Sequence, residues 1–295
     1  MIRRKRSKGL WSPTVAGSGW GESTYAELSW DKSRSAASRW AVFGLVVGAV
    51  IGLVAFLPAA WLARAVSAAT SERLQLADAR GTVWDGSAVV VLTGGPESRD
   101  ASALPGRLDW TLRPSGLGVE LRARQACCLN GPVSLRIRPG LGTMSIVLAP
   151  SPGWTGQWPS AWLGGLGTPW NTLQLGGNLR LVSPGLTIES VQGRWRVQGR
   201  AELELSGASS RLTTLDSLGS YLLTLSGDPA QAGVAQLNLS TQEGALQLSG
   251  TGTWSPSGVR FRGEARAGAA DEAVLTNLLN IIGRREGARS VISIG

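Results

Sequence analysis

Few residues in this chain could carry chemistry, and their types exclude several kinds of active site. The 295 residues include no His and 2 Cys, so the commonest general base and metal ligand is missing. The last lysine is Lys32, so serine nucleophiles beyond it have neither His nor Lys as a base. We therefore predict no enzyme activity and no catalytic, metal or cofactor-binding site.

The two cysteines, Cys127 and Cys128, are adjacent. Two thiolates alone cannot complete a tetrahedral zinc site. A disulfide between adjacent residues cannot crosslink two distant segments of the chain. Because a vicinal disulfide is strained, the pair is interpreted as a buried apolar couple or a labile thiol. An intermolecular disulfide is the alternative.

The acidic and glycine-rich segments carry no motif for chemistry. Asp and Glu residues alternate with Arg along expected strands and have no spacing typical of a catalytic cleft. The Gly164-Gly165-Leu166-Gly167 segment lacks the lysine and the helix context of a phosphate-binding loop. The arginines of the polar strand face are interpreted as a solvated surface rather than a phosphate-binding strip, and no nucleic-acid partner is expected.

Residues 40–63 contain no formal charge and are long enough to cross a bilayer as one helix. Eight cations precede this segment, whereas Arg64 and Arg73 are the cations that follow closely. The positive-inside rule then predicts a cytoplasmic N-terminus and an exported region at 64–295, which in a bacterium is periplasmic. A signal peptide cleaved after Val66-Ser67-Ala68 is the alternative, disfavoured by the length of the apolar run.

The segment before the span, residues 1–39, is basic and shows no helical or strand periodicity. We expect this cytoplasmic tail to be mostly flexible.

Residues 64–295 alternate apolar and polar side chains, as in Leu108, Trp110 and Leu112 or Leu223 and Leu225. This pattern, separated by Gly and Pro turns, predicts roughly ten short strands with one buried face. The expected fold class is mainly β, an extended antiparallel sheet after one N-terminal transmembrane helix, with a few short helices.

Two helices are expected within this region. Residues 270–283 show i, i+3, i+4 apolar spacing, and residues 209–218 are predicted as a short helix with a serine cap. Similar Pro-x-Ala-Trp-Leu segments at Pro58 and Pro159 predict an internal repeat of 58–150 and 159–256.

Five motifs, in this order, carry a family resemblance: Phe56-Leu57-Pro58-Ala59-Ala60-Trp61-Leu62, Gly81-Thr82-Val83-Trp84-Asp85-Gly86-Ser87-Ala88, Ser209-Ser210-Arg211-Leu212, Leu218-Gly219-Ser220-Tyr221 and Asn277-Leu278-Leu279-Asn280-Ile281-Ile282-Gly283-Arg284-Arg285. With them, residues 45–295 resemble the type II secretion system protein N family. The structural or interaction candidates taken from these motifs are Gly81, Thr82, Trp84, Gly86, Ser209, Ser210, Arg211, Leu218, Gly219, Tyr221, Asn280, Ile282, Gly283, Arg284 and Arg285.

The resemblance implies a single-pass inner-membrane component of the general secretory pathway. Its expected partners are the inner-membrane assembly platform, with the outer-membrane secretin as a further candidate. The periplasmic region also resembles the one-face-apolar sheets of AsmA-like proteins, so a lipid-handling or envelope-bridging protein is the alternative. A filled core would favour the scaffold, and an accessible apolar face would favour lipid.

Overall fold

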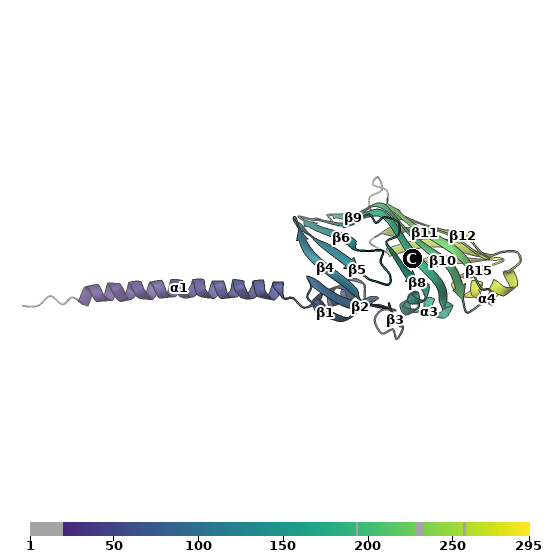
Figure 1. Ribbon diagram of the computed structural model, residues 1–295. Coiled ribbons are helices and arrows are strands. Elements are labelled where there is room, and N and C mark those ends of the chain that lie inside the picture. The colour runs from purple at the N-terminus through teal and green to yellow at the C-terminus, as the bar shows by residue number, and fades with distance from the viewer. Residues whose placement is uncertain (1–19, 193, 228–232, 256–257) are drawn as a thin grey trace, which may run out of the picture. The chain divides into compact units, whose positions relative to one another are not determined.

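The computed structural model describes residues 20–192, 194–227, 233–255 and 258–295, with the backbone alone described for residues 20–37. The chain divides into two units, residues 1–55 and residues 56–295, and each is described by itself. Helices and strands are labelled in Figure 1.

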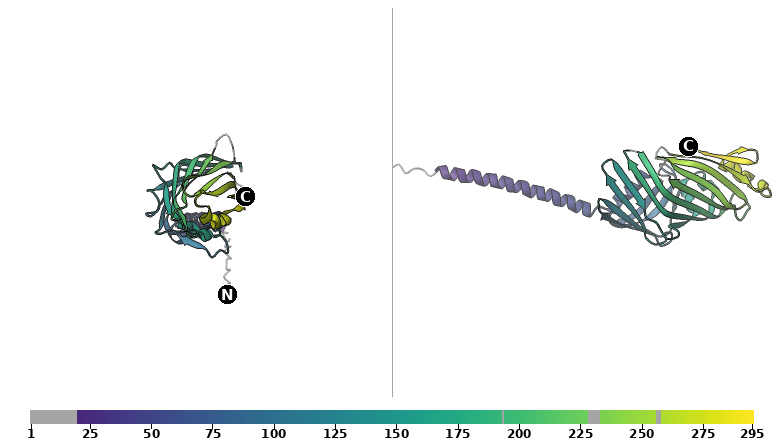
Figure 2. Two further views of the ribbon diagram at one scale, coloured as in Figure 1. Left: turned by 90° about the vertical axis from the view of Figure 1, so that its right-hand side faces the viewer. Right: turned by 90° about the horizontal axis from the view of Figure 1, so that it is seen from above.

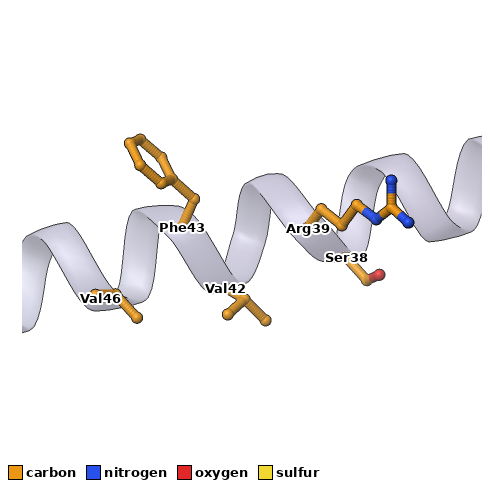
Figure 3. A pocket seen from close by; sticks show the side chains of 5 residues that line it. All are labelled: Ser38, Arg39, Val42, Phe43 and Val46. Atoms are coloured by element: carbon orange, nitrogen blue, oxygen red, sulfur yellow. The ribbon is translucent and has the colours of Figure 1, made fainter.

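The first unit is the helix α1 (Trp20–Ala55). Its segment Ser38–Ala55 is long and apolar enough to cross a membrane, the one such helix among the described residues. Figure 3 shows a shallow hollow on this helix, where Phe43 and Arg39 point to one side and Val42 and Val46 to the other. These side chains are exposed.

Two expectations for this region are corrected. The tail is helical from Trp20 onward rather than flexible, because extending a helix that already exists costs little. Residues 1–19 of the predicted tail lie outside the described residues. The helix expected over 40–63 ends at Ala55, since Pro58 has no amide hydrogen and disfavours helical geometry at Leu57.

The second unit is built on one antiparallel sheet with few helices. Its elements, in chain order, are α2 (Ala59–Ala69), β1 (Leu74–Gly81), β2 (Asp85–Thr93), β3 (Ala101–Ala103), β4 (Leu108–Ser115), β5 (Gly118–Arg124), β6 (Val133–Gly140), β7 (Thr143–Leu148), β8 (Gly156–Pro159), the 3-10 helix η1 (Ser160–Leu166), α3 (Trp170–Leu173), β9 (Leu175–Val191), β10 (Arg194–Ser210), β11 (Gly219–Gly227), β12 (Ala235–Glu243), β13 (Leu246–Ser255), β14 (Gly258–Ala267), α4 (Glu272–Ile282), β15 (Arg284–Glu286) and β16 (Arg289–Ile294).

The strands follow the chain order almost without exception. The sheet runs β1-β2-β4-β5-β6-β7-β9-β10-β11-β12-β13-β14-β16-β15, with β3 against β2 and β8 against β9. Figure 2 shows this sheet curving around an inner face. The expectation of an antiparallel, mainly β fold is confirmed, whereas the strands number 16 rather than about ten.

Period-two patterning places apolar side chains in register across neighbouring strands. Leu112 lies opposite Leu121, which lies opposite Leu135, and the row continues through Leu148 to Leu186. Comparable rows cross β10 to β12 and meet Gly250 and Gly252 in β13. The whole sheet therefore has one apolar face and one polar face.

Helices and loops fill this apolar face only at certain places. The largest cluster packs α4 onto the strands β10 to β14, and its buried members are Leu173, Ala208, Leu218, Tyr221, Leu246, Ala265, Leu275, Leu278 and Leu279. A second cluster joins Ala59 of α2 to Ala88 and Trp110. A third gathers Val90, Leu104 and Cys128. Between these clusters, the row from Leu112 to Leu186 is only half-buried.

Two local predictions are wrong. Residues 211–218 form turns rather than a helix, because Ser209 and Ser210 complete the long strand β10. The alternation of Leu173 and Leu175 also predicts a strand, but the chain there forms the end of α3 and a left-handed Gln174, which redirects it into β9.

The helix expected over 270–283 is present as α4, within a residue or two at each end. The internal repeat stays a prediction. Both Pro58 and Pro159 precede a helical segment, α2 and η1, as that interpretation requires.

The packing of α4 gives a direct test of the largest cluster. Replacing buried Leu278 with Ala is expected to lower the free energy of unfolding by about 2–5 kcal/mol, because it leaves a cavity. The control Val274→Ala, on the exposed side of the same helix, is expected to cost less than about 1 kcal/mol. Urea unfolding of the full chain in detergent measures both, and equal losses would contradict this packing.

Candidate functional site

The first group of candidate residues forms the turn between β1 and β2. The amide of Thr82 donates to the carbonyl of Asp85 at 2.8 Å, and its hydroxyl accepts from the Asp85 amide at 3.1 Å. Gly81 has φ of +85°, a conformation that favours glycine. A Cβ at Gly86 would lie 2.6 Å from the Trp110 ring.

This turn holds the segment that enters the sheet domain. Thr82 pairs with Pro58, and the amide of Val83 donates to the carbonyl of Leu57 at 2.8 Å. The indole of buried Trp110 donates to the carbonyl of Val83 at 3.1 Å. The motif Gly81-Thr82-Val83-Trp84 therefore anchors the start of the domain to β4.

Arg107 fastens the same corner from the polar face of the sheet. Its guanidinium donates to the Asp78 carboxylate at 2.7 Å and to the Ser87 hydroxyl at 3.0 Å. Arg107, with help from Arg80, holds the pKa of the Asp78 carboxyl below its ordinary value. Because this carboxyl is exposed, the pair orients side chains more than it stabilises the fold.

The second group, Ser209 to Tyr221, forms a satisfied loop beneath α4. The Ser210 hydroxyl donates to the carbonyl of Leu173 at 2.6 Å and accepts from the amide of Leu212 at 3.3 Å. Ser210 therefore joins α3 to the end of β10. Ser209 is half-buried, and Arg211 is exposed after the strand ends.

Tyr221 and Gly219 seal this loop against β13. The buried Tyr221 hydroxyl shares its proton between the carbonyls of Leu246, at 2.9 Å, and Leu218, at 3.2 Å. Burial raises the pKa of this phenol far above its ordinary value, so it remains a donor. Gly219 has φ of +141°, and a Cβ there would overlap the carbonyl oxygen of Glu243.

The third group follows α4. Two arginines directly after a helix predict neutralisation of its C-terminal dipole, and the structure differs from that expectation. Gly283 is extended with φ of −171°, and Arg284 and Arg285 lie in β15 rather than in a helical cap. The Arg285 guanidinium reaches Glu272, in the first turn of α4, at 3.4 Å and also donates to the carbonyl of Gly287. It therefore cannot neutralise the C-terminal dipole of the helix.

The structure brings the second and third groups together and leaves the first in another cluster. Leu218 and Tyr221 share the cluster of Leu279, and Ile282 packs at its edge. Buried Ser290 donates to the carbonyl of Leu279 at 2.7 Å, which ties β16 to the helix. Asn280 and Arg284 face solvent, and no ion pair to Arg284 occurs among the described side chains.

Sequence reasoning missed the outer face of α4. Val274 and Ile281 are 37% and 39% exposed, and they lie seven residues apart with Asn277 between them. The apolar spacing of the helix assigned both to the core. Both lie at the edge of the apolar stripe of the helix, on the side of polar Asn277, and this edge position was the signal that could have separated them.

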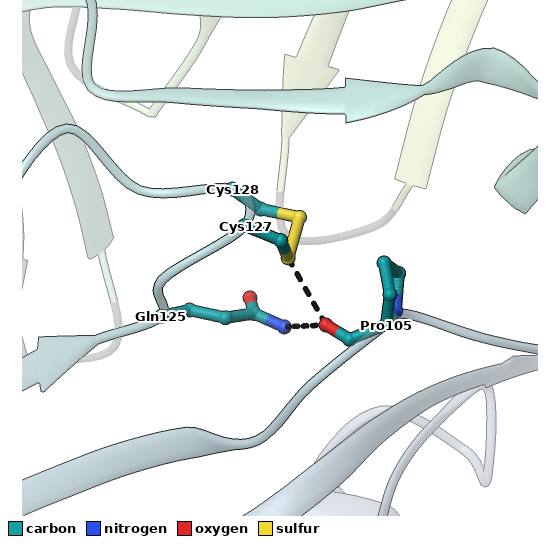
Figure 4. The surroundings of a disulfide bond; sticks show 4 residues. All are labelled: Pro105, Gln125, Cys127 and Cys128. Carbon is teal, nitrogen blue, oxygen red and sulfur yellow. Dashed lines mark hydrogen bonds between the residues drawn. A yellow bond between two sulfur atoms is a disulfide. The ribbon is translucent and has the colours of Figure 1, made fainter.

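The cysteines form a disulfide, which corrects the expectation of free thiols. Cys127 is joined to Cys128, and Figure 4 shows the Cys127 sulfur beside the carbonyl of Pro105, 3.1 Å away. The Gln125 amide donates to the same carbonyl at 3.5 Å. The carbonyl of Cys128 accepts from the Gln157 amide at 2.8 Å, so this loop joins β8 to the connection before β4.

These arrangements position surfaces rather than reacting groups. Among the described residues, no three His, Cys, Asp or Glu side chains gather closely enough to hold a metal ion. The candidate that remains accessible is the outer face of α4, defined here as Val274, Asn277 and Ile281 on the helix together with Arg284 in the following strand β15.

The Gly219 contact gives a stability test with an internal control. Gly219→Ala is expected to lower the free energy of unfolding by more than about 2 kcal/mol, from backbone strain plus overlap with Glu243. Gly207→Ala, also at positive φ but with open space, is expected to cost about 1 kcal/mol. Thermal unfolding of the full chain compares them, and a Gly219→Ala protein as stable as the Gly207→Ala protein would refute the close contact.

Comparison with known proteins places the sheet domain in a family. The family model described as type II secretion system (T2SS), protein N, matches residues 72–293. No curated protein and no solved structure is significantly similar to the chain. Because the match covers almost the whole sheet domain, the chain belongs to the type II secretion system protein N family.

Proposed function

We propose that this protein is a non-enzymatic, single-pass component of the type II secretion machinery in the inner membrane. The segment Ser38–Ala55 is its span, with the N-terminus in the cytoplasm and the sheet domain in the periplasm. The protein helps to assemble or link the inner-membrane platform and the outer-membrane secretin. The family match over residues 72–293 is the observation that carries this proposal.

The charge around the span supports the orientation. Arg39 stands at its N-terminal end, after the basic first residues, whereas the next cation after Ala55 is Arg64. Excess Lys and Arg before a span favours retention of that side in the cytoplasm.

The outer face of α4 is our candidate for the contact with the platform. The helix is held from beneath by Leu275, Leu278 and Leu279, so its exposed side chains are already ordered before a partner binds. A pre-ordered surface loses less conformational entropy on binding. Val274 and Ile281 supply apolar anchors, and Arg284 supplies a charge for an acidic partner.

Site-specific crosslinking in cells tests this contact. A photoreactive amino acid at position 281 is expected to crosslink to a platform protein, whereas one at Gln247, exposed on β13, is not. The double variant Ile281→Ser with Arg284→Ala is expected to reduce secretion roughly tenfold, equivalent to 1.4 kcal/mol of binding energy. In the same variant, a photoreactive amino acid placed at position 277 is expected to give a roughly tenfold lower crosslink yield.

The unfolding midpoint of this double variant is expected to stay near that of the parent, since both side chains are exposed. Loss of secretion together with a lower unfolding midpoint would mean that these residues serve folding rather than partner binding. Crosslinks only to cytoplasmic proteins would refute the proposed orientation.

A second candidate function is the handling of lipid acyl chains along the apolar face of the sheet. The observation that favours it is the incomplete filling of this face, where the row from Leu112 to Leu186 is half-buried. Trp110 is buried, but Trp195 and Trp254 are only half-buried and do not close the face. An apolar surface left partly open between packed ends fits an extended hydrocarbon chain.

Photoactivatable phospholipid tests this second candidate in the purified full chain. Labelling is expected on the apolar face, and Leu237→Asp is expected to reduce it at least about fivefold because a carboxylate disfavours hydrocarbon contact. Asn238→Asp, next along β12 on the opposite face, is the matched control and is expected to change little. Labelling confined to α1, with none on the sheet, would exclude the lipid function.

A further inference from the structure

Two leucines at the tips of neighbouring hairpins are fully open to solvent. Leu117, between β4 and β5, is 94% exposed, and Leu141, between β6 and β7, is 104% exposed. They are the most exposed large apolar side chains among the described residues. Each occupies a two-residue turn beside a glycine at positive φ, Gly116 or Gly142. These turns do not need leucine for their geometry, since glycine supplies the positive φ.

The two leucines lie close together at one end of the sheet. Val119 pairs with Ile137, which sets Leu117 opposite Pro139 and Leu141 two positions further out. Strand spacing and rise place the two Cα atoms on the order of 10 Å apart. Figure 1 shows β4, β5 and β6 side by side, as these pairings require.

Arginines surround these tips and lack acidic partners. Arg113, Arg138 and Arg194 are exposed, and no ion pair involving them occurs among the described residues. Glu120 lies opposite Arg113 in register, but its carboxylate is bound by Arg122 at 3.0 Å. Glu189 lies opposite Arg196 in register. The Gln192 amide donates to the carbonyl of Gly142 at 2.8 Å, which brings the residue after β9 close to Leu141. We define the tip surface as Leu117, Leu141, Arg113, Arg138 and Arg194.

The segment that enters the domain from the apolar span lies at the same end of the sheet. Leu57 and Pro58 pair with Val83 and Thr82 in the β1–β2 turn, and that turn is bonded to β4 through Leu112. Phe56 and Trp61, on either side of this contact, are 77% and 58% exposed. Exposed aromatic residues next to a span are typical of the membrane interface.

We propose that the tip surface docks onto the surface of an anionic phospholipid bilayer, the one that the Ser38–Ala55 span enters. Leu117 and Leu141 insert among the acyl chains, while the three arginines bind lipid phosphates. The inference rests on the membrane anchoring proposed above. A bilayer fits better than a protein because both leucines stand on protruding turns that soft hydrocarbon can surround.

Docking would give the sheet domain a second attachment to the membrane besides its covalent one. A single helix leaves a domain free to rotate about the connection, whereas two attachments set which edge faces the bilayer. The helix α4 packs through its inner face on β10 to β14. Its outer face would then point away from the tip surface.

Depth measurements on the full chain in nanodiscs test the docking. An environment-sensitive fluorophore is attached to Leu117→Cys or Leu141→Cys, while Cys127 and Cys128 remain unreactive in their disulfide. Nitroxide lipids of an anionic bilayer are expected to quench these positions at least about threefold more than the control Arg99→Cys. Arg99 is exposed in the loop after β2, at the opposite end of the sheet.

Two further variants test the chemistry of the contact. Arg113→Gln with Arg138→Gln is expected to lower the ratio of docked to free tips roughly tenfold in anionic nanodiscs and little in zwitterionic ones. Leu141→Ser is expected to reduce quenching at position 117. Because all these side chains are exposed, the unfolding midpoint is expected to remain that of the parent.

The outcomes separate this inference from the proposed anchoring. A chain that fails to enter nanodiscs refutes the anchoring itself. A chain that enters, but whose positions 117 and 141 are quenched no more than position 99, refutes the docking alone. The docking is also refuted if the fluorophores at positions 117 and 141 become shielded from water only after a purified platform protein is added. It is refuted as well if their quenching is the same in anionic and zwitterionic bilayers.

Discussion

Backbone hydrogen bonding between antiparallel neighbours is the interaction on which this domain depends. Among the described residues, the buried apolar side chains form three separate clusters, and none of these spans the sheet from β1 to β15. Continuity comes instead from the unbroken succession of strand pairs from β1 to β15. Each strand is positioned by pairing with its neighbours, and the alternation of apolar and polar side chains selects the register of that pairing.

This dependence explains which features were predictable from the sequence. The alternation at Leu108, Trp110 and Leu112 is local, and it correctly indicated strands, their one-sided character and the antiparallel class. The periodicity of α4 was similarly sufficient, because a helix that packs on a sheet must carry its own apolar stripe.

The predictions that were wrong concern features that depend on contacts between residues distant in sequence. Ser210 looked like a helix cap, but its partner is the carbonyl of Leu173, which local propensity does not reveal. Arg284 and Arg285, which follow α4, were predicted to neutralise the C-terminal dipole of that helix. Arg285 instead pairs with Glu272, in the first turn of α4. Several of the motif residues are fixed by backbone contacts, as at Gly219. The accessible residues Val274 and Ile281 were hidden within a pattern typical of core.

The long hairpin of β9 and β10, 17 residues in each strand, lies between the N-terminal and C-terminal halves of the sheet. A force that slides these halves past each other along the strands would load many of its cross-strand hydrogen bonds at once, in shear. A force that separates the strands from one end would break the same bonds one after another. The domain is therefore mechanically anisotropic, stiff along its strands and weak across them, which matters for any part that connects two membranes.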